Sequence, residues 1–389
     1  GGAWLRVPVS GQHEYLAATP AGALQPQSMS GVGAPTLRDA KGADYVVIVS
    51  PSMSAAATRL ADYRGKQGLK TMVVTTAQIY DEFNHGVSSP KAIKSFVGYA
   101  STKWKTVARY VVLAGEGSYD YMDYSGAGDC AVPALLVDSI GGLVVSDALL
   151  ADNKGGDGVP EVAIGRIPAA TARELDQALA KIKSYESTKG APKRSVLLAA
   201  DNADGGGDFG PDSDSLAAVI PKQIRVDKAY LDDMAFASVR AKVLSSFVDG
   251  TLLVSYIGHA GVDQAAQEGL LSTADVATLG SNKALPVFTA YTCYLGQYGL
   301  PGYDSLGESL LMRRGAGAIA TWAPTALERN DFSVALGRLF TENLFDGSRN
   351  VRLGNVIQES LVEGARQGLP MEMLSTYVLL GDPALKVKW

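Results

Sequence analysis

The chain has 389 residues, of which 47% are hydrophobic and 19% charged, a balance that supports a globular protein with one large domain or two smaller ones. Its formal net charge of −5, without a basic run, argues against nucleic-acid binding, and no apolar stretch reaches the roughly 18 residues of a membrane helix. The first residues, Gly1-Gly-Ala-Trp, lack the basic and apolar regions of a signal peptide, so none is expected there.

The first half of the chain alternates short apolar runs with amphipathic stretches. Residues 1–43 are irregular and indicate an N-terminal arm or linker. From residue 44 the alternation is typical of parallel strands connected by helices, so residues 44–188 are predicted to form an N-terminal α/β subdomain. We expect strands at 45–49, 70–75, 110–114 and 160–165, and helices at 53–67, 90–103 and 171–186.

The same pattern begins again at residue 195, so residues 189–389 are predicted to form a second, C-terminal α/β subdomain. The two subdomains can share an interface or one continuous sheet, and the pattern leaves this open. We expect strands at 195–200, 223–227, 251–257, 285–291 and 316–321, helices at 215–221, 236–246, 273–279, 304–313, 331–344 and 353–366, and a turn into a last strand after residue 381.

Two of these predicted strands each end at a reactive side chain. His259 follows the strand at 251–257, and Cys293 follows the strand at 285–291. In α/β sheets reactive groups gather beyond the carboxyl ends of strands, and the 34 positions between the two residues suffice for one helical crossover. We therefore expect Cys293 to be a nucleophile with His259 as its base. The only other cysteine is Cys130, and both are expected to be free, because pairing them would consume the nucleophile.

Glycine accompanies both strand ends, which has a chemical use. Glycine lets the backbone approach a substrate closely, so the amides near Cys293 and those of Ala260 and Gly261 are candidate donors to an oxyanion. The chain contains no G-x-S-x-G, H-E-x-x-H or C-x-x-C motif, which leaves a serine hydrolase or a catalytic zinc without support. Acyl transfer through a thiol is the chemistry that remains, and it requires no cofactor.

Several segments between residues 36 and 389 resemble, in order, those of the gingipain-like cysteine peptidases. They include Tyr110-Val-Val-Leu-Ala-Gly-Glu-Gly-Ser-Tyr-Asp, Pro160-Glu-Val-Ala-Ile-Gly-Arg-Ile-Pro168, the His and Cys segments, and Leu380-Gly-Asp-Pro-Ala384. The resemblance implies a caspase-like α/β fold, with largely parallel sheets flanked by helices in two α/β subdomains. It also implies that Cys293 is the nucleophile, that His259 is the base, and that Glu161, beside the Gly-Arg-Ile-Pro strand, orients the histidine.

The resemblance leaves some site residues open. Asp147 and Asp152 are the alternatives to Glu161, although Asp147 is expected to be structural. The family places glycine directly after the histidine, whereas this chain has Ala260 there, which puts the oxyanion geometry in question.

The resemblance also suggests a substrate preference and a metal. The best-known family members cut after basic residues and bind that side chain with an acid. A basic residue before the scissile bond is therefore expected. The pocket loops are expected to follow the strands that end near residues 168 and 321, and Trp322 and Glu328, in the second of these regions, are the substrate-binding candidates. Family members often bind structural calcium, for which Asp201, Asp204 and Asp208 are weak candidates, the alternative being a solvated loop.

The leading hypothesis is a secreted or cell-surface bacterial cysteine endopeptidase that cleaves a protein or peptide substrate through a thioester acyl-enzyme. One alternative is a transpeptidase or sortase-like processing enzyme of a secretion system. A second is a catalytically impaired caspase-fold binding module, suggested by Ala260. A third is an intracellular regulatory protease of the caspase type. The full-length protein is also expected to carry a further C-terminal domain, because relatives often continue into an immunoglobulin-like domain.

Overall fold

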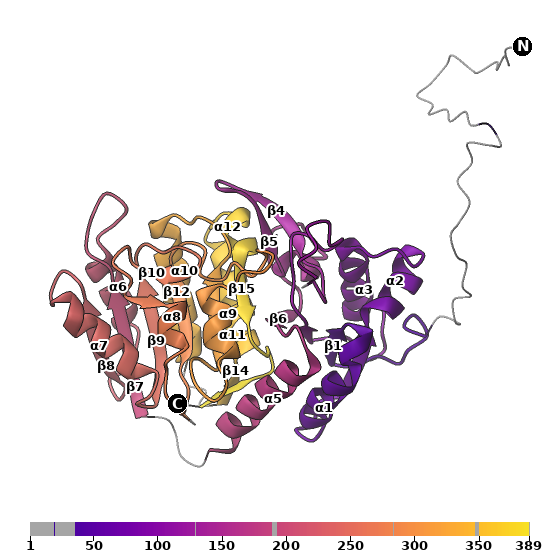
Figure 1. Ribbon diagram of the computed structural model, residues 1–389, viewed down its shortest axis with the longest axis horizontal. Coiled ribbons are helices and arrows are strands. Elements are labelled where there is room, and N and C mark those ends of the chain that lie inside the picture. Colours follow the sequence, from indigo (N-terminus) through magenta and orange to yellow (C-terminus); the bar gives the residue numbers. More distant parts are fainter. Residues whose placement is uncertain are drawn as a thin grey trace, which may run out of the picture. The chain divides into compact units, whose positions relative to one another are not determined.

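A mixed β-sheet of ten strands runs through the described part of the chain (Figure 1). The computed structural model describes Thr19 and residues 36–128, 130–188, 193–282, 284–346 and 350–388, so most of the predicted arm at 1–43 lies outside the described residues. In spatial order the strands are β2 (Thr71–Thr75), β1 (Tyr45–Val49), β3 (Tyr110–Ala114), β6 (Ala163–Ile167), β15 (Tyr377–Leu380), β13 (Ala320–Pro324), β12 (Val287–Tyr291), β9 (Thr251–Ile257), β7 (Lys193–Ala200) and β8 (Arg225–Tyr230).

The direction of the strands reverses once across the sheet. Strands β2, β1, β3, β6 and β15 are parallel to one another, as are β13, β12, β9, β7 and β8, while β15 and β13 pair antiparallel. Strands from both predicted subdomains thus join in one sheet. The carboxyl ends of β9 and β12 lie at one edge of it, and those of β1, β3 and β6 lie at the opposite edge.

The central strands are buried on both faces because their sequences are continuous apolar runs. Alternate residues of a strand point to opposite faces, and in β12 Val287 and Tyr291 belong to one core cluster while Phe288 and Ala290 belong to another. The prediction of a largely parallel sheet covered on both faces is confirmed.

Helices supply these two covering layers. None of the helices in the described residues is both long and apolar enough to cross a bilayer. They are the 3₁₀ helix η2 (Pro51–Met53) and the α-helices α1 (Ser54–Gly65), α2 (Thr76–Asn84), α3 (Pro90–Thr102), α4 (Ala148–Ala151), α5 (Ala172–Ser187), α6 (Phe209–Ala217), α7 (Phe236–Ser246), α8 (Thr273–Val276), α9 (Leu306–Met312), α10 (Asn330–Leu344), α11 (Leu353–Arg366) and α12 (Met371–Thr376).

Some elements differ from those expected. The strand predicted at 316–321 begins only at Ala320, because Gly317 adopts a positive φ of 70° in a turn against α9. Helix α2 and the hairpin of β4 and β5 were not predicted. Besides the main sheet, the described residues form three two-stranded sheets: β4 (Leu135–Ser139) with β5 (Gly142–Ser146), β10 (Gln264–Ala265) with β11 (Leu271–Ser272), and β14 (Asn350–Arg352) with β16 (Lys386–Lys388).

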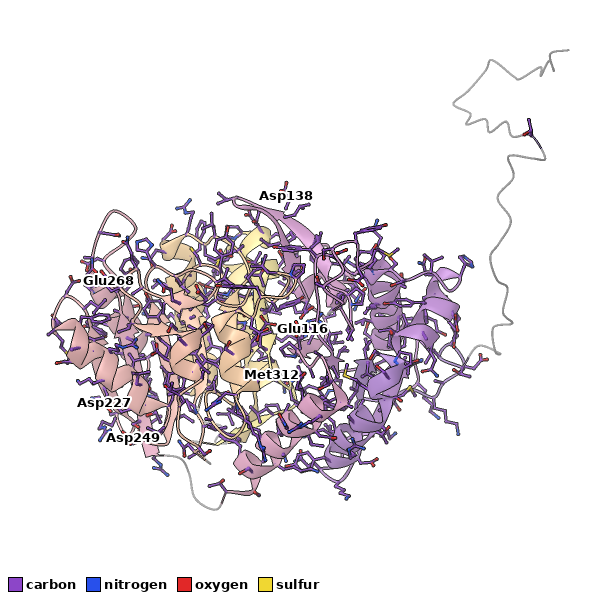
Figure 2. All side chains as sticks on the ribbon, in the orientation of Figure 1. Glu116, Asp138, Asp227, Asp249, Glu268 and Met312 are labelled. Atoms are coloured by element: carbon purple, nitrogen blue, oxygen red, sulfur yellow. The ribbon has the colours of Figure 1, made fainter. Side chains whose placement is uncertain are left out.

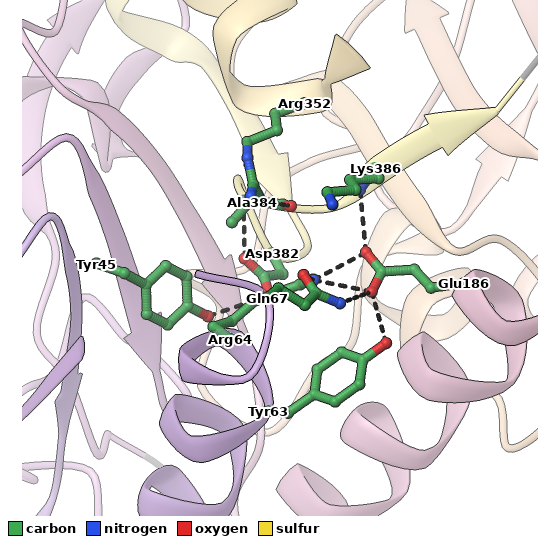
Figure 3. A network of polar contacts seen from close by, with 9 residues as sticks. All are labelled: Tyr45, Tyr63, Arg64, Gln67, Glu186, Arg352, Asp382, Ala384 and Lys386. Carbon is green, nitrogen blue, oxygen red and sulfur yellow. Dashed lines mark hydrogen bonds and ion pairs between the residues drawn. The ribbon is translucent and has the colours of Figure 1, made fainter. Parts of the chain in front are cut away.

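A buried polar network connects the first helices to the last strands (Figure 3). Arg64 of α1 forms ion pairs with Asp382, after β15, at 2.7 Å and with Glu186 of α5 at 2.8 Å. The hydroxyl groups of Tyr45 and Tyr63 donate to these same two carboxylates, at 3.1 and 2.7 Å. The Gly-Asp-Pro-Ala segment around Asp382 therefore has a structural role, since it holds β15 against the amino-terminal half of the sheet.

Candidate active site

Cys293 lies just beyond the carboxyl end of β12. The next residue, Tyr294, has a positive φ of 56°, and the Leu295 N–H donates to the Cys293 carbonyl at 2.8 Å. The half-buried thiol accepts a hydrogen bond from the Glu328 N–H at 3.4 Å. This tight turn places the sulfur beyond the sheet, beside the loop that follows β13. As expected, no disulfide joins Cys130 to Cys293.

His259 occupies the matching position on the neighbouring strand. Strands β9 and β12 are parallel, and Ile257 of β9 pairs with Tyr291 of β12. His259 and Cys293 each lie two residues beyond this pair, and both line one pocket of about 550 Å³. The structure therefore brings the predicted nucleophile and base together at one edge of the sheet.

The pocket is built from the loops that follow β7, β9, β12 and β13. Its lining comes from residues within 206–209, 258–259, 291–293 and 327–333. The Thr292 hydroxyl donates to the Gly258 carbonyl at 2.5 Å and so ties two of these loops together. At the rim, Arg329 and Asp331 form an exposed ion pair at 2.7 Å.

Helix α9 is hydrogen-bonded to the loops that carry His259 and Cys293. The Leu306 N–H donates to the Val262 carbonyl, in the loop after His259, and the Gly307 N–H donates to the Leu295 carbonyl, in the turn after Cys293. Glu308, in the capping box of this helix, is buried against Glu116, and burial raises the pKa of both carboxyl groups, that of Glu116 to about 7. Figure 2 labels Glu116.

The acid beside the imidazole is Asp204. Its Oδ2 lies 2.9 Å from His259 Nε2. The Gly206 N–H donates to Asp204 at 2.7 Å and lowers the pKa of that carboxyl, and His259 contributes in the same direction. An ionised Asp204 can only accept a hydrogen bond, so Nε2 carries the hydrogen and Nδ1 is left as the basic nitrogen of the ring. A Cβ at Gly206 would come within 2.8 Å of the imidazole, so any larger residue there would displace the ring from Asp204.

Asp201 fixes the backbone of the histidine. Its Oδ2 accepts a hydrogen bond from the His259 N–H at 3.1 Å, and the Tyr256 hydroxyl lies within hydrogen-bonding distance of both Asp201 and the His259 carbonyl. Two of the three calcium candidates are thus engaged at the histidine. In the described ranges, no group of three or more His, Cys, Asp or Glu side chains is arranged to hold a metal ion. A calcium ion at Asp201, Asp204 and Asp208 stays a prediction.

The structure does not bring Glu161 to the histidine. Its carboxylate accepts hydrogen bonds from the backbone amides of Asn153 and Lys154, at 2.6 and 3.1 Å, and it lines a different pocket. The physical reason is strand order: Glu161 precedes β6, and β15, β13 and β12 separate β6 from β9. At about 4.8 Å per strand this is a separation of roughly 19 Å. The expectation that Glu161 orients His259 is corrected accordingly, in favour of Asp204.

The two alternative acids are engaged elsewhere. Asp147 forms a bidentate ion pair with the buried Arg166, with nitrogen–oxygen distances of 2.7 and 2.9 Å, and it also accepts the Tyr298 hydroxyl hydrogen bond at 2.6 Å. Asp152 accepts a hydrogen bond from the Gly158 N–H. Both carboxylates hold the segment that leads into β6.

The two substrate-binding candidates have different positions. Trp322 is fully buried in β13 and packs against Tyr291, Phe340 and Tyr377, so it does not line the pocket. Glu328 does line it. Burial raises the pKa of Glu328 to about 7, and the Thr376 hydroxyl donates to its carboxylate.

The amides proposed for the oxyanion are not equivalent. The Gly261 N–H is committed to the Gln264 carbonyl at 3.0 Å. Ala260 lies opposite Ala265 in an antiparallel bridge, as a pair that exchanges no hydrogen bonds. The N–H of Ala260 therefore does not bond to the opposite strand. Ala260 is not among the described residues with positive φ, so alanine causes no strain here. The Ala260 amide therefore stays a candidate oxyanion donor, whereas the Gly261 amide is already engaged.

The state of the thiol gives a testable pH dependence. Burial raises the pKa of Cys293, so the free protein holds a neutral thiol at neutral pH. We expect the rate of Cys293 alkylation by iodoacetamide to keep rising with pH beyond the pKa of an ordinary thiol. Mass spectrometry of the labelled peptide measures this rate. A plateau already reached below about pH 6 would instead show a preformed thiolate.

Comparisons with known proteins agree with this geometry. The sequence model of peptidase family C25 matches residues 38–388. The chain is similar in structure to the Arg-specific cysteine proteinase gingipain R (RgpB), with a TM-score of 0.73, 21% identity and coverage of 90% of this chain and 79% of the other. No match is found among curated protein sequences.

Two further solved structures have the same arrangement. The complex of the pro- and mature domains of Porphyromonas gingivalis RgpB gives a TM-score of 0.72 at 21% identity, covering 88% of this chain and 79% of the other. A structure described only as a protease gives 0.70 at 15% identity, covering 88% and 78%. These likenesses establish the fold, which is the caspase-like fold of the gingipains.

Proposed function

Because this chain belongs to peptidase family C25 and is a cysteine peptidase, we propose that it cleaves peptide bonds within proteins through Cys293 and His259. The proposal rests on the matching positions of Cys293 and His259 on two neighbouring strands. Each residue lies two positions beyond the paired residues Ile257 and Tyr291, and both side chains line the same pocket. A thiol and an imidazole in such a pocket form a nucleophile with its general base.

The proposed reaction proceeds through a thioester. His259 removes the thiol proton as Cys293 Sγ attacks the substrate carbonyl carbon, and the oxyanion accepts hydrogen bonds from the Cys293 and Ala260 amides. The imidazolium then donates its proton to the leaving amine as the carbon–nitrogen bond breaks. Water, deprotonated by His259, attacks the thioester, which releases the acid and restores the thiol. Asp204 stabilises the imidazolium and holds its ring.

We propose that the pocket prefers a basic side chain before the scissile bond. Glu328 is the partly buried acid in the lining of this pocket, and its backbone N–H contacts the nucleophilic sulfur. A substrate cation would compensate an ionised Glu328 that is otherwise poorly solvated. We also propose that the protein acts outside the cell or on the surface of a bacterium. This localisation rests on the glycine-rich composition of the chain and on its resemblance to the gingipains.

The pKa of Glu328 makes the basic preference depend on pH. With a pKa of about 7 in the free protein, Glu328 is mostly neutral at pH 6 and mostly ionised at pH 8. The ratio of kcat/KM for an arginine peptide to that for its neutral citrulline counterpart should therefore rise, by roughly fivefold, over this range. Because both substrates use the same thiol and imidazole, the titration of the catalytic pair cancels in the ratio.

Glu328→Gln is the matched variant for this experiment, since it keeps the shape of the side chain and removes its charge. In Glu328→Gln the ratio should stay near one at every pH. Cleavage that favours citrulline, or a wild-type ratio that does not change with pH, would contradict the role of Glu328. Absence of any cleavage of a mixed peptide library would contradict the proposed peptidase activity itself.

A further inference from the structure

An apolar hairpin stands beside the candidate active site. Strands β4 and β5 pair only with each other in the described part of the chain, outside the main sheet. Leu136 and Leu143 share one face of the hairpin, because Leu136 pairs with Val145 and Asp138 pairs with Leu143. Leu136 is 40% exposed and Leu143 59%, and Figure 2 shows Asp138 at the outer margin of the hairpin.

The tip of this hairpin is held firmly against the pocket. The Ile140 N–H donates to Glu372 of α12 at 2.8 Å. Gly141 is so close to the pocket residues that a Cβ there would lie 2.3 Å from the Tyr294 hydroxyl and 3.1 Å from Leu327 Cδ1. Tyr294 follows the nucleophile directly, and Leu327 lines the pocket. The hairpin therefore continues the surface of the pocket outward, with no intervening loop at this contact.

The surface that connects the hairpin to the pocket is formed by exposed aliphatic side chains. Ile140 at the tip is 73% exposed, and Leu327 at the pocket rim is 39% exposed. Together with Leu136 and Leu143 they form what we name the hairpin patch. Isolated exposed aliphatic residues are ordinary, but a group of them that adjoins a ligand pocket marks a binding surface.

We propose that the hairpin patch is a second substrate subsite, which binds an aliphatic or aromatic side chain of the polypeptide being cleaved. This inference rests on the proposed function, since the occupant is the substrate that enters the Cys293 pocket. A five-residue strand is about 17 Å long, so the patch reaches substrate residues within about five positions of the scissile bond.

The continuity with the pocket favours the substrate over other occupants. The tip contact formed by Tyr294, Leu327 and Gly141 adjoins the pocket, so a substrate anchored there can extend along the hairpin. The anchoring of the tip by Glu372 means that the patch is already formed in the free protein, which reduces the entropy cost of binding.

The test compares substrate selection in wild type, Leu143→Ser and Ile140→Ser. Fluorogenic peptides carry a mixture of side chains at the cleaved position, so that the result does not depend on the basic preference, and leucine or serine at each of five flanking positions on both sides. Wild type should favour leucine about tenfold in kcat/KM at one or two positions. Both variants should bring this preference close to one while cleaving the serine peptides within about twofold of wild type. Val87→Ser is the control, because Val87 is an exposed aliphatic residue too, at 61%, but lies after α2 and outside the hairpin patch.

Failure of this inference can be separated from failure of the proposed function. Binding of fluorescent leucine and serine peptides to Cys293→Ala needs no turnover, and fluorescence anisotropy should show about tenfold tighter binding of the leucine peptide, lost when Leu143→Ser is added. Equal binding of the two peptides would overturn the subsite even if wild type is an active peptidase. The subsite is also overturned if Leu143→Ser changes the oligomeric state in sedimentation experiments and leaves peptide selection as it was, since the patch would then bind a second copy of the chain.

Discussion

Replacing Cys293 with alanine should abolish peptidase activity, with a loss on the order of 10⁵-fold or more in kcat, because no acyl-enzyme can form. Replacing His259 with alanine should lower kcat/KM by about 10²- to 10⁴-fold, which is the usual contribution of a general base. Both variants should fold normally, since the thiol is half-buried and the imidazole is about half exposed. Cleavage of a mixed peptide library, measured by mass spectrometry, tests both, and Cys130→Ala serves as the matched thiol control.

The same assay decides which acid supports the histidine. Asp204→Asn removes a charged hydrogen-bond partner from Nε2 and should lower kcat by about tenfold. The loss should appear in kcat and shift the acid limb of the pH profile, because Asp204 acts on the imidazole and not on the substrate. Glu161→Gln should stay near wild type. A larger loss in Glu161→Gln than in Asp204→Asn would reverse this assignment.

Of the substitutions proposed here, Asp147→Ala should cause the largest decrease in the free energy of unfolding. Arg166 is completely buried, and Asp147 is its carboxylate partner at 2.7 and 2.9 Å. Without Asp147 the guanidinium keeps only the carbonyls of Gly115 and Val132 as hydrogen-bond acceptors. An uncompensated buried charge costs about 3–5 kcal/mol of the free energy of unfolding, which urea denaturation followed by circular dichroism can measure.

A surface ion pair provides the control for Asp147. Asp176 pairs with Arg59 at 2.6 Å, but both side chains are exposed, so Asp176→Ala should cost no more than about 1 kcal/mol. The double variant Asp147→Leu with Arg166→Met should be more stable than Asp147→Ala, because it removes the charge along with its partner. An equal decrease in the free energy of unfolding in Asp147→Ala and Asp176→Ala would show that the buried ion pair stabilises the protein no more than the exposed one.

The strands that carry the nucleophile and base could be predicted because their signal is local. Each is a continuous apolar run that a sheet buries on both faces, and each ends where a reactive residue meets a glycine-containing turn. Their adjacency followed from the length of the crossover between them. The hairpin, which was not predicted, also had a local signal, since apolar runs at 135–137 and 143–145 flank a glycine pair.

No local sequence pattern indicates the order and direction of the other strands in the sheet. Glu161 precedes a predicted strand, but its distance from His259 depends on how many strands lie between them, and that number is set by long-range packing. The reversal at β15 likewise places the residues after β6, around residue 168, at the edge opposite to Cys293, although a pocket loop was expected there. Asp204 could have been identified, because its loop follows β7, the neighbour of β9.

The single reversal of strand direction at β15 gives the molecule two independent rims. One rim collects the loops that line the pocket of Cys293 and His259, and the other collects the turns that follow β1, β3 and β6. Changes of length or sequence on the second rim leave the spacing of Cys293 and His259 untouched, because that spacing is fixed by the register of β9 with β12. Evolution can therefore attach new contacts to that far side without disturbing the chemistry.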